Sequence, residues 1–323
     1  MASAGQSDTM LTPAGTLFTI ESELVSDSAD STTVSDTHLF LTSRTGAETK
    51  KEMIPATIVD GSHTDAAMAF DADSGMLFVF WIHSKSLTGS ELLFASRDAN
   101  GAWSEPTQFG GRIFDLRKNL RIAVTRKYYD DEENVLRSGI SVHAVWWEWD
   151  THLGEWFAQY QMITIVNGAV AETPAALDLR EIARAEAPAA TDKLELDALA
   201  QPLIFPSPKQ DSVLLVFGDV QTQQLHEVRV SPFKAKAEGR LRVPVGRREG
   251  GSKAPTLVVA QGSRMDGVYG DNERMAFFTT DKDAVRYVVM KDGTWSEPQQ
   301  ITLDSQITAG AAVDALRRLV SEH

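Results

Sequence analysis

The residues of this chain with the clearest chemical potential follow a short repeated pattern. Gly61-Ser62-His63 and Gly251-Ser252-Lys253 each carry a glycine, a serine and then a basic residue, and Lys118 falls at the matching place of a third segment. A histidine titrates near neutral pH and can act as a general acid or base, whereas a lysine ammonium attracts anions. We therefore expect these three basic side chains to gather at one site if the fold repeats with the sequence.

Further polar and aromatic residues lie in segments that the same repeat would bring to this site. His83 joins His63 and Lys253 as an expected catalytic residue, because it too can transfer protons. A tryptophan offers a flat apolar surface for stacking on a ligand, and an arginine can clamp an anion. The alternative for each residue is an ordinary surface side chain, so the prediction depends on their convergence. The expected ligand-binding residues here are Asp65, Asp115, Arg117, Lys118, Trp149 and His152.

The composition excludes several kinds of site and partner. The 323 residues include 31 lysines and arginines against 45 aspartates and glutamates, and the net charge of −14 argues against a nucleic-acid or anionic-membrane surface. The chain has no cysteine, so thiolate zinc sites and cysteine nucleophiles are excluded. Because no metal-binding, nucleotide-binding or serine-hydrolase motif occurs, we expect neither a metal nor a cofactor.

A repeated hairpin indicates how these segments are organised. Gly101–Pro106 and Gly293–Pro298 share the pattern Gly-x-Trp-Ser-Glu-Pro, and each follows an apolar run that ends in a polar turn. More degenerate copies lie at 39–55, 155–174 and 224–244. Two further strand-like runs precede most of these hairpins, and such short runs between turn residues are typical of all-β folds. Four strands in each repeat favour a β-propeller with four-stranded antiparallel blades.

The repeat predicts one propeller domain over residues 1–323. Six blades are the alternative to five, and 175–197, rich in alanine and glutamate, is expected to be an insertion with a short helix. The first blade lacks one strand. The C-terminal segment 303–323 has two interpretations, because 311–321 has helical periodicity whereas 308–314 would complete the first blade. The five predicted blades cover residues 10–57, 58–109, 110–174, 198–245 and 250–302.

A propeller would place the candidate residues on one face. Loops between blades and loops between the second and third strands of a blade open on the same side, at the mouth of the central tunnel, where we expect the ligand. Trp103 and Trp295 have a fixed place in the repeated hairpin, so we expect them to pack between neighbouring blades rather than to bind a ligand.

Three segments carry a family resemblance. Gln224–Glu227, Arg274–Phe278 and Gly293–Pro298 look like the Ile-x-Glu element, the arginine strand and the repeat ending of the fucose-specific propeller lectins of fungi and bacteria. The chain resembles Asp-box propellers such as sialidases more loosely. The lectin resemblance implies that Glu227 and Arg274 bind a glycan. They lie in the predicted fourth and fifth blades, so no blade carries the complete pair, which favours one unique site at the axis.

These observations predict a propeller that binds one small molecule and acts without a metal or redox cofactor. We favour a cofactor-independent enzyme, since propellers that resemble this lectin type include cyclases of natural-product pathways, hetero-Diels–Alder catalysts among them. A glycan-binding lectin and a protein-interaction scaffold are the alternatives. The expected partner is a small molecule or a glycan, with no nucleic acid and no membrane. The N-terminus lacks the pattern of a secretory signal, so we expect a cytoplasmic protein, in an oligomeric state that stays open.

Overall fold

The structure is a computed structural model of the 323-residue chain. Lys253, Arg274, Asp115 and His152 lie outside the residues that it describes, as does most of the predicted insertion at 175–197. The described residues are 8–12, 14–26, 35–71, 74–86, 88–111, 116–130, 135–151, 154–166, 169–172, 177–178, 202–206, 212–219, 224–230, 245–246, 264–269, 275–280, 283–291, 294–304, 312, 315–316 and 319–320.

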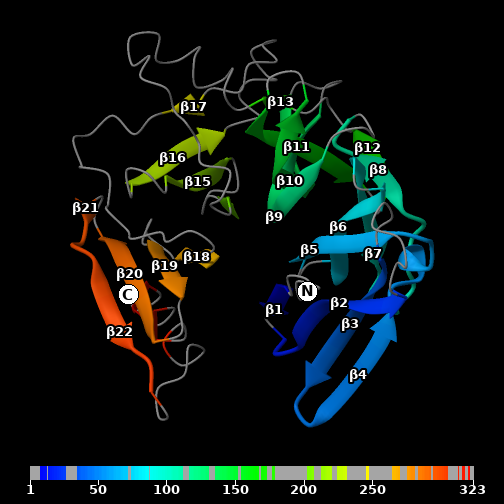
Figure 1. Ribbon diagram of the computed structural model, residues 1–323, viewed down its shortest axis with the longest axis horizontal. Coiled ribbons are helices and arrows are strands. Elements are labelled where there is room, and N and C mark those ends of the chain that lie inside the picture. The colour runs from blue at the N-terminus through cyan, green and yellow to red at the C-terminus, as the bar shows by residue number, and fades with distance from the viewer. Residues whose placement is uncertain are drawn as a thin grey trace. The chain divides into compact units, whose positions relative to one another are not determined.

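The strands form five antiparallel sheets, each built from strands that follow one another along the chain, and the fold is a five-bladed β-propeller, as the repeat predicted (Figure 1). The first sheet has the order β1 (Asp8–Leu11), β2 (Leu17–Ser26), β3 (Asp36–Thr45), β4 (Glu48–Met53). The second has the order β5 (Ser62–Asp71), β6 (Met76–Ser86), β7 (Gly89–Arg97), β8 (Thr107–Phe109). A 3-10 turn, η1 (Pro55–Thr57), lies between these two sheets in the chain.

The other three sheets follow the same pattern. The third contains β9 (Arg117–Asp130), β10 (Val135–Asp150), β11 (Glu155–Val166) and β12 (Ala169–Glu172), with β13 (Leu177–Asp178) also paired to β11. The fourth contains β14 (Leu203–Pro206), β15 (Val213–Asp219), β16 (Gln224–Val230) and β17 (Val245–Gly246). The fifth contains β18 (Arg264–Tyr269), β19 (Met275–Thr280), β20 (Ala284–Lys291) and β21 (Thr294–Trp295), with β22 (Gln299–Thr302) also paired to β20.

The chain divides into two compact units. Unit 1 comprises Met1–Val124 and Gly139–Asp178, and unit 2 comprises Thr125–Ser138 and Leu179–His323. All candidate site residues whose side chains the structure describes belong to unit 1, so the site is built below from unit 1 alone. No helix among the described residues is long and apolar enough to cross a membrane.

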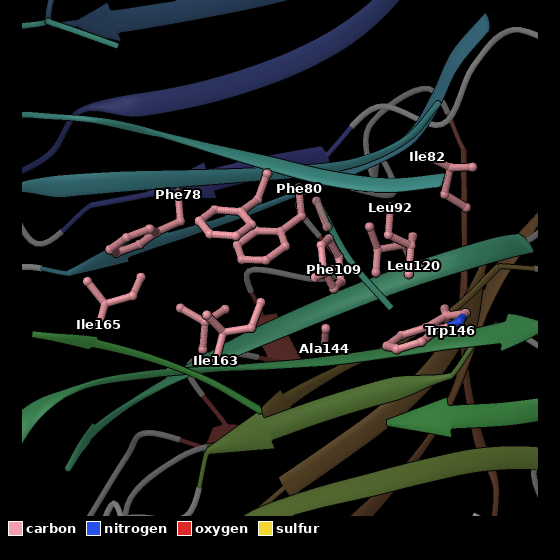
Figure 2. Packing of buried hydrophobic residues seen from close by; sticks show 13 residues of the cluster. Phe78, Phe80, Ile82, Leu92, Phe109, Leu120, Ala144, Trp146, Ile163 and Ile165 are labelled. Carbon is pink, nitrogen blue, oxygen red and sulfur yellow. The ribbon is translucent and has the colours of Figure 1, made fainter. Parts of the chain in front are cut away.

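Two apolar clusters among the described residues of unit 1 share β6. Side chains alternate across a strand, so Phe78, Phe80 and Ile82 point to one face of the second sheet and Leu77, Val79 and Trp81 to the other. The first set packs against the third blade, and Figure 2 shows Phe78 and Phe80 opposite Ile163 and Ile165. The second set packs against the first blade, and Trp103 lies at its edge, as expected of a tryptophan between blades.

The first blade corrects one expectation from the sequence. Its four strands all come from the N-terminal region, because β1 pairs with β2 in the register Asp8↔Ile20 to Leu11↔Leu17. The prediction that this blade lacks a strand was therefore wrong, and no strand from the C-terminus is needed to complete it. A run of only four residues lying so close to the start of the chain gave too weak an alternation to be recognised as a strand.

The C-terminal segment follows its helical interpretation. Ala312, Leu316 and Val320 have helical backbone and are buried, and their spacing of four residues places them on one helix face. Ala312 and Leu316 share an apolar cluster with Phe278 and Val285 of the fifth blade. The helical interpretation of 311–321 is therefore the correct one, because the helix presents one apolar face that packs on the sheet of the fifth blade.

Candidate functional site

Two of the expected catalytic residues form a stacked pair in the second blade. His63, on β5, and His83, on β6, are directly opposite each other, and their ring centroids are 4.5 Å apart with an interplanar angle of 7°. Both side chains are buried, with 0% and 2% of the residue surface exposed. Two histidines that the sequence assigned to one site thus lie side by side, and both rings lie beneath the surface.

The hydrogen bonds of the pair show which groups each ring faces. His83 Nδ1 lies 2.7 Å from the Glu91 carboxylate and His83 Nε2 lies 3.1 Å from the carbonyl of Asp60. A carboxylate and a carbonyl both accept hydrogen bonds, so each ring nitrogen of His83 faces an acceptor. His63 Nε2 donates to the carbonyl of Val59 at 3.3 Å. His63 Nδ1 is buried and has no hydrogen-bond partner among the described residues.

The environment keeps the His63 ring neutral. Burial lowers the pKa of His63 from its ordinary 6.5 to about 4, and the charge on His83 lowers it further in the same direction. The His63 ring thus stays neutral at pH 7 and stacks on His83, whose two nitrogens face the acceptors Glu91 and Asp60.

Two residues with left-handed backbone mark equivalent positions in the second and third blades. Asp65 has φ +50° and Asn119 has φ +58°, and the Asn119 amide donates to Asp65 Oδ2 at 2.8 Å. Burial raises the pKa of the Asp65 carboxyl, and the bond from Asn119 opposes that rise. If these two positions are aligned, the residue equivalent to His63 is Arg117 and not Lys118. The repeat read from the sequence was therefore displaced by one residue.

Arg117 forms a buried clamp between the second and third blades. Its Nε donates to Glu148 Oε2 at 2.8 Å, and its other nitrogens donate to the carbonyls of Ser90 and, at 3.1 Å, Gly110. Glu148 also accepts from Trp146 Nε1 at 3.0 Å. The side chains of Arg117 and Glu148 are only 1% and 11% exposed. The expected anion clamp is therefore occupied by a carboxylate of the protein itself.

Trp149 belongs to a different group at the end of the third blade. It lies directly opposite Trp156 in the β10–β11 pairing, with ring centroids 5.5 Å apart and an interplanar angle of 62°. The ammonium of Lys118 lies 4.0 Å from the centroid of the Trp156 ring, within the range of a cation–π interaction. All three side chains are half-buried. We call this group of Lys118, Trp149 and Trp156 the tryptophan platform.

The structure thus assembles some of the expected site residues in unit 1 and leaves others untested. It brings together the two histidines, Arg117 with its carboxylate, and the tryptophan platform. Glu227 lies on β16 opposite Val216, and its side chain is outside the described part of the structure. Within the described residues, no group of three or more histidine, aspartate or glutamate side chains is arranged to hold a metal ion. The remaining candidates, whose positions are not described, are Asp115, His152, Lys253 and Arg274.

Three residues that complete these groups were missed in the sequence. Glu91 holds His83, Glu148 holds Arg117, and Trp156 pairs with Trp149. Each stands on the strand that follows its partner's strand or on the same blade, so correct strand pairing within each blade would have revealed Glu91 and Trp156. The register of both hairpins could be counted outward from the pairs Ser86↔Gly89 and Asp150↔Glu155. Glu148 stands on β10, which neighbours β9 and its Arg117 in the same sheet, so the pairing of these two strands would have indicated it as well.

Comparison with known proteins supports the fold. The chain is similar to the Hadza microbial sialidase Hz136, with a TM-score of 0.51 and 11% identity over 92% of this chain and 58% of the sialidase. It is also similar to the α-L-arabinanase of Penicillium chrysogenum, with a TM-score of 0.49 and 9% identity over 89% of this chain and 76% of that one. The chain spans little more than half the length of the sialidase.

No protein-family model matches the chain, and neither does any curated protein sequence. At 11% sequence identity, the similarity between this chain and the sialidase shows a shared fold and carries no conclusion about activity. The likeness to fucose-specific lectins remains a prediction from the sequence. What the similarity to the sialidase establishes is that this chain has the β-propeller fold.

Proposed function

We propose that the protein binds a carbohydrate at the tryptophan platform of the third blade. The observation that carries the proposal is the cross-strand pair of half-buried tryptophans, Trp149 and Trp156, with the Lys118 ammonium over the second ring. A sugar ring has an apolar face of C–H groups and a rim of hydroxyl groups. An indole supports the first and a lysine ammonium donates to the second.

The two tryptophans have different tasks in this proposal. Lys118 occupies one face of Trp156, and the edge contact with Trp149 limits the rotation of both rings. Trp149 is then the stacking surface, held in place before the ligand arrives, so little conformational entropy is lost on binding. Both indoles are half-buried, so part of each ring remains accessible to a ligand.

Two further points support a carbohydrate over other small molecules. One solved structure that is similar to this chain, with a TM-score of 0.51, is a sialidase, an enzyme named for a sugar. The resemblance to lectins, which names Glu227 and Arg274 as glycan contacts, points to the same ligand class. A cyclase, which was the leading hypothesis from the sequence, requires proton donors that reach a substrate. His63 and His83 are buried and hydrogen-bonded within the second blade, so we do not propose that activity for this conformation.

A glycan array tests the proposal. The wild-type protein, Trp149→Ala and Trp103→Ala would be applied at the same concentration. Trp103 is a matched control because it is also a half-buried tryptophan in a hairpin, and it packs on the cluster between the first and second blades. We expect the wild type and Trp103→Ala to bind the same set of glycans and Trp149→Ala to bind none of them. An array without any wild-type binding, or one on which Trp149→Ala keeps the wild-type profile, would contradict the proposal.

A further inference from the structure

The stacked histidines lie directly beneath a short loop, residues 58–61, between η1 and β5. The loop carbonyls of Val59 and Asp60 accept from the Nε2 atoms of His63 and His83, at 3.3 Å and 3.1 Å. Beyond these bonds, the Gly61 amide donates to Asp36 Oδ1 at 2.8 Å, and the Gly61 carbonyl accepts from Thr37 at 3.0 Å. The loop is therefore attached to unit 1 by polar contacts to two histidine rings and to the start of β3.

Apolar burial contributes little to holding this loop. The side chains of Ile58 and Val59 are exposed, at 55% and 48%, although both are large and aliphatic. A segment with few buried apolar contacts opens locally at a small fraction of the free energy of global unfolding. The loop is therefore held mainly by hydrogen bonds, and two of these come from the histidine rings.

The stack offers no acceptor for a proton added to His63. Both nitrogens of His83 are already engaged, by Glu91 and by the carbonyl of Asp60. A proton added to His63 would go to Nδ1, which is buried and has no partner among the described residues, and would place a positive charge 4.5 Å from the centre of the His83 ring. Relief then requires His63 to move toward water, and the loop over its Nε2 edge lies on that path.

We propose that residues 58–61 form an acid-opened latch over the second blade, in which protonation of His63 breaks the stack with His83 and releases the loop carbonyls of Val59 and Asp60. Closed, the latch covers both rings. Open, it exposes two imidazoles and the end of β5 to solvent. The inference is independent of carbohydrate binding, because it concerns the first and second blades and is measured without a ligand.

The charged groups around His63 come from four directions and favour this behaviour. From β6, His83 opposes a positive charge on His63, and from β3, His38 does so more weakly. Asp36, at the start of β3, favours the charge, but its carboxylate already accepts from Gly61. Glu91, on β7, is engaged by His83. The carboxylate of Asp60 lies on the loop itself and would leave with it. In the described part of the chain, each of the three carboxylates named here is thus either already hydrogen-bonded or carried by the loop itself.

Spin-label spectroscopy tests the latch, and the absence of native cysteine makes the labelling specific. A nitroxide attached to Val59→Cys reports the mobility of the loop, and one attached to Asn100→Cys, in an exposed turn of the same blade, is the matched control. Spectra would be recorded from pH 7.5 to 3.5. We expect the mobile component at position 59 to increase severalfold with a midpoint near pH 4, while the label at position 100 does not change.

Two further variants separate the latch from a general effect of acid. In a His63→Phe or His63→Gln background, the label at position 59 should lose its acid transition, and the second substitution serves if the first prevents folding. Gly61→Ala should increase mobility already at pH 7.5, because an added Cβ would lie 2.7 Å from the Ser84 carbonyl and 2.8 Å from His83 Nε2. An acid transition that persists without His63, a label at 59 that stays immobile at pH 3.5, or equal transitions at both positions would each overturn the proposal.

Discussion

Removal of the Arg117 side chain is expected to lower the free energy of unfolding more than removal of an exposed charged side chain does. Arg117→Met deletes a guanidinium that donates to Glu148, Ser90 and Gly110, and no water-exposed alternative exists, because the arginine side chain is 1% exposed. The substitution leaves the carboxylate of Glu148 buried, where it still accepts from the Trp146 indole. It also leaves two backbone carbonyls without this partner.

The magnitude follows from the burial of the pair. Breaking a buried ion pair by removing one partner costs about 3 to 5 kcal/mol, because an uncompensated charge remains in the interior. Glu148→Leu should cost a similar amount, since it leaves Arg117 charged. The double variant removes both charges, so we expect it to lose less than the sum of the single losses by about 2 kcal/mol. Lys50→Met is the control, because Lys50 pairs with Glu52 at 2.8 Å but is 62% exposed.

Urea unfolding at pH 7, followed by tryptophan fluorescence and circular dichroism, measures these differences. The exposed control should change the free energy of unfolding by less than about 1 kcal/mol. The account of the buried clamp would be refuted if Arg117→Met lost no more than Lys50→Met. It would also fail if the losses of the two single variants were simply additive in the double variant.

Three further predictions concern other buried groups. Burial lowers the pKa of His143 from 6.5 to about 3, so the stability that the neutral ring contributes is complete above pH 6.5 and is lost as the pH falls to about 3. Between these two pH values, His143→Asn should reduce the slope of the unfolding free energy against pH by about 1.4 kcal/mol per pH unit. An unchanged slope would contradict this prediction. Gly110→Ala should lower the unfolding free energy by about 1 to 3 kcal/mol in urea, because φ is +76° and the new Cβ would overlap the side chain of Leu92. Gly111→Ala, where φ is +82° and the space around the new Cβ is open, should lower it by about 1 kcal/mol, and equal losses would show that the overlap does not matter. Leu316→Ala, in the buried face of the C-terminal helix, should lower the unfolding free energy by about 2 to 5 kcal/mol, and a loss below about 0.5 kcal/mol would mean that the helix does not pack on the fifth blade.

The fold was largely predictable because blades repeat. The Gly-x-Trp-Ser-Glu-Pro hairpins and the fully apolar run of β6 gave the blade count, and the structure explains that run, since alternate side chains such as Phe80 and Trp81 enter different clusters. Strand β1 was not predictable in the same way. Its four residues are identified only by pairing with β2, and that pairing is a property of the assembled sheet.

The candidate site was predictable in composition but not in chemistry. The sequence pointed to His63, His83, Arg117 and Trp149, and all four lie at the ends of strands in unit 1. It could not show that the first three are buried, because burial depends on neighbouring blades. Alignment of the left-handed residues Asp65 and Asn119 makes Arg117 the equivalent of His63, one residue before Lys118, and a backbone conformation of this kind is not visible in the sequence.

The most direct test of carbohydrate binding at the tryptophan platform is a calorimetric titration with the best sugar from the array. Truncation of a central tryptophan in a binding site costs about 2 kcal/mol or more. We therefore predict that Trp149→Ala weakens binding at least about tenfold, that Trp149→Phe retains part of the affinity, and that Trp103→Ala binds as the wild type does. Equal affinity of the wild type and Trp149→Ala for that sugar would contradict the account.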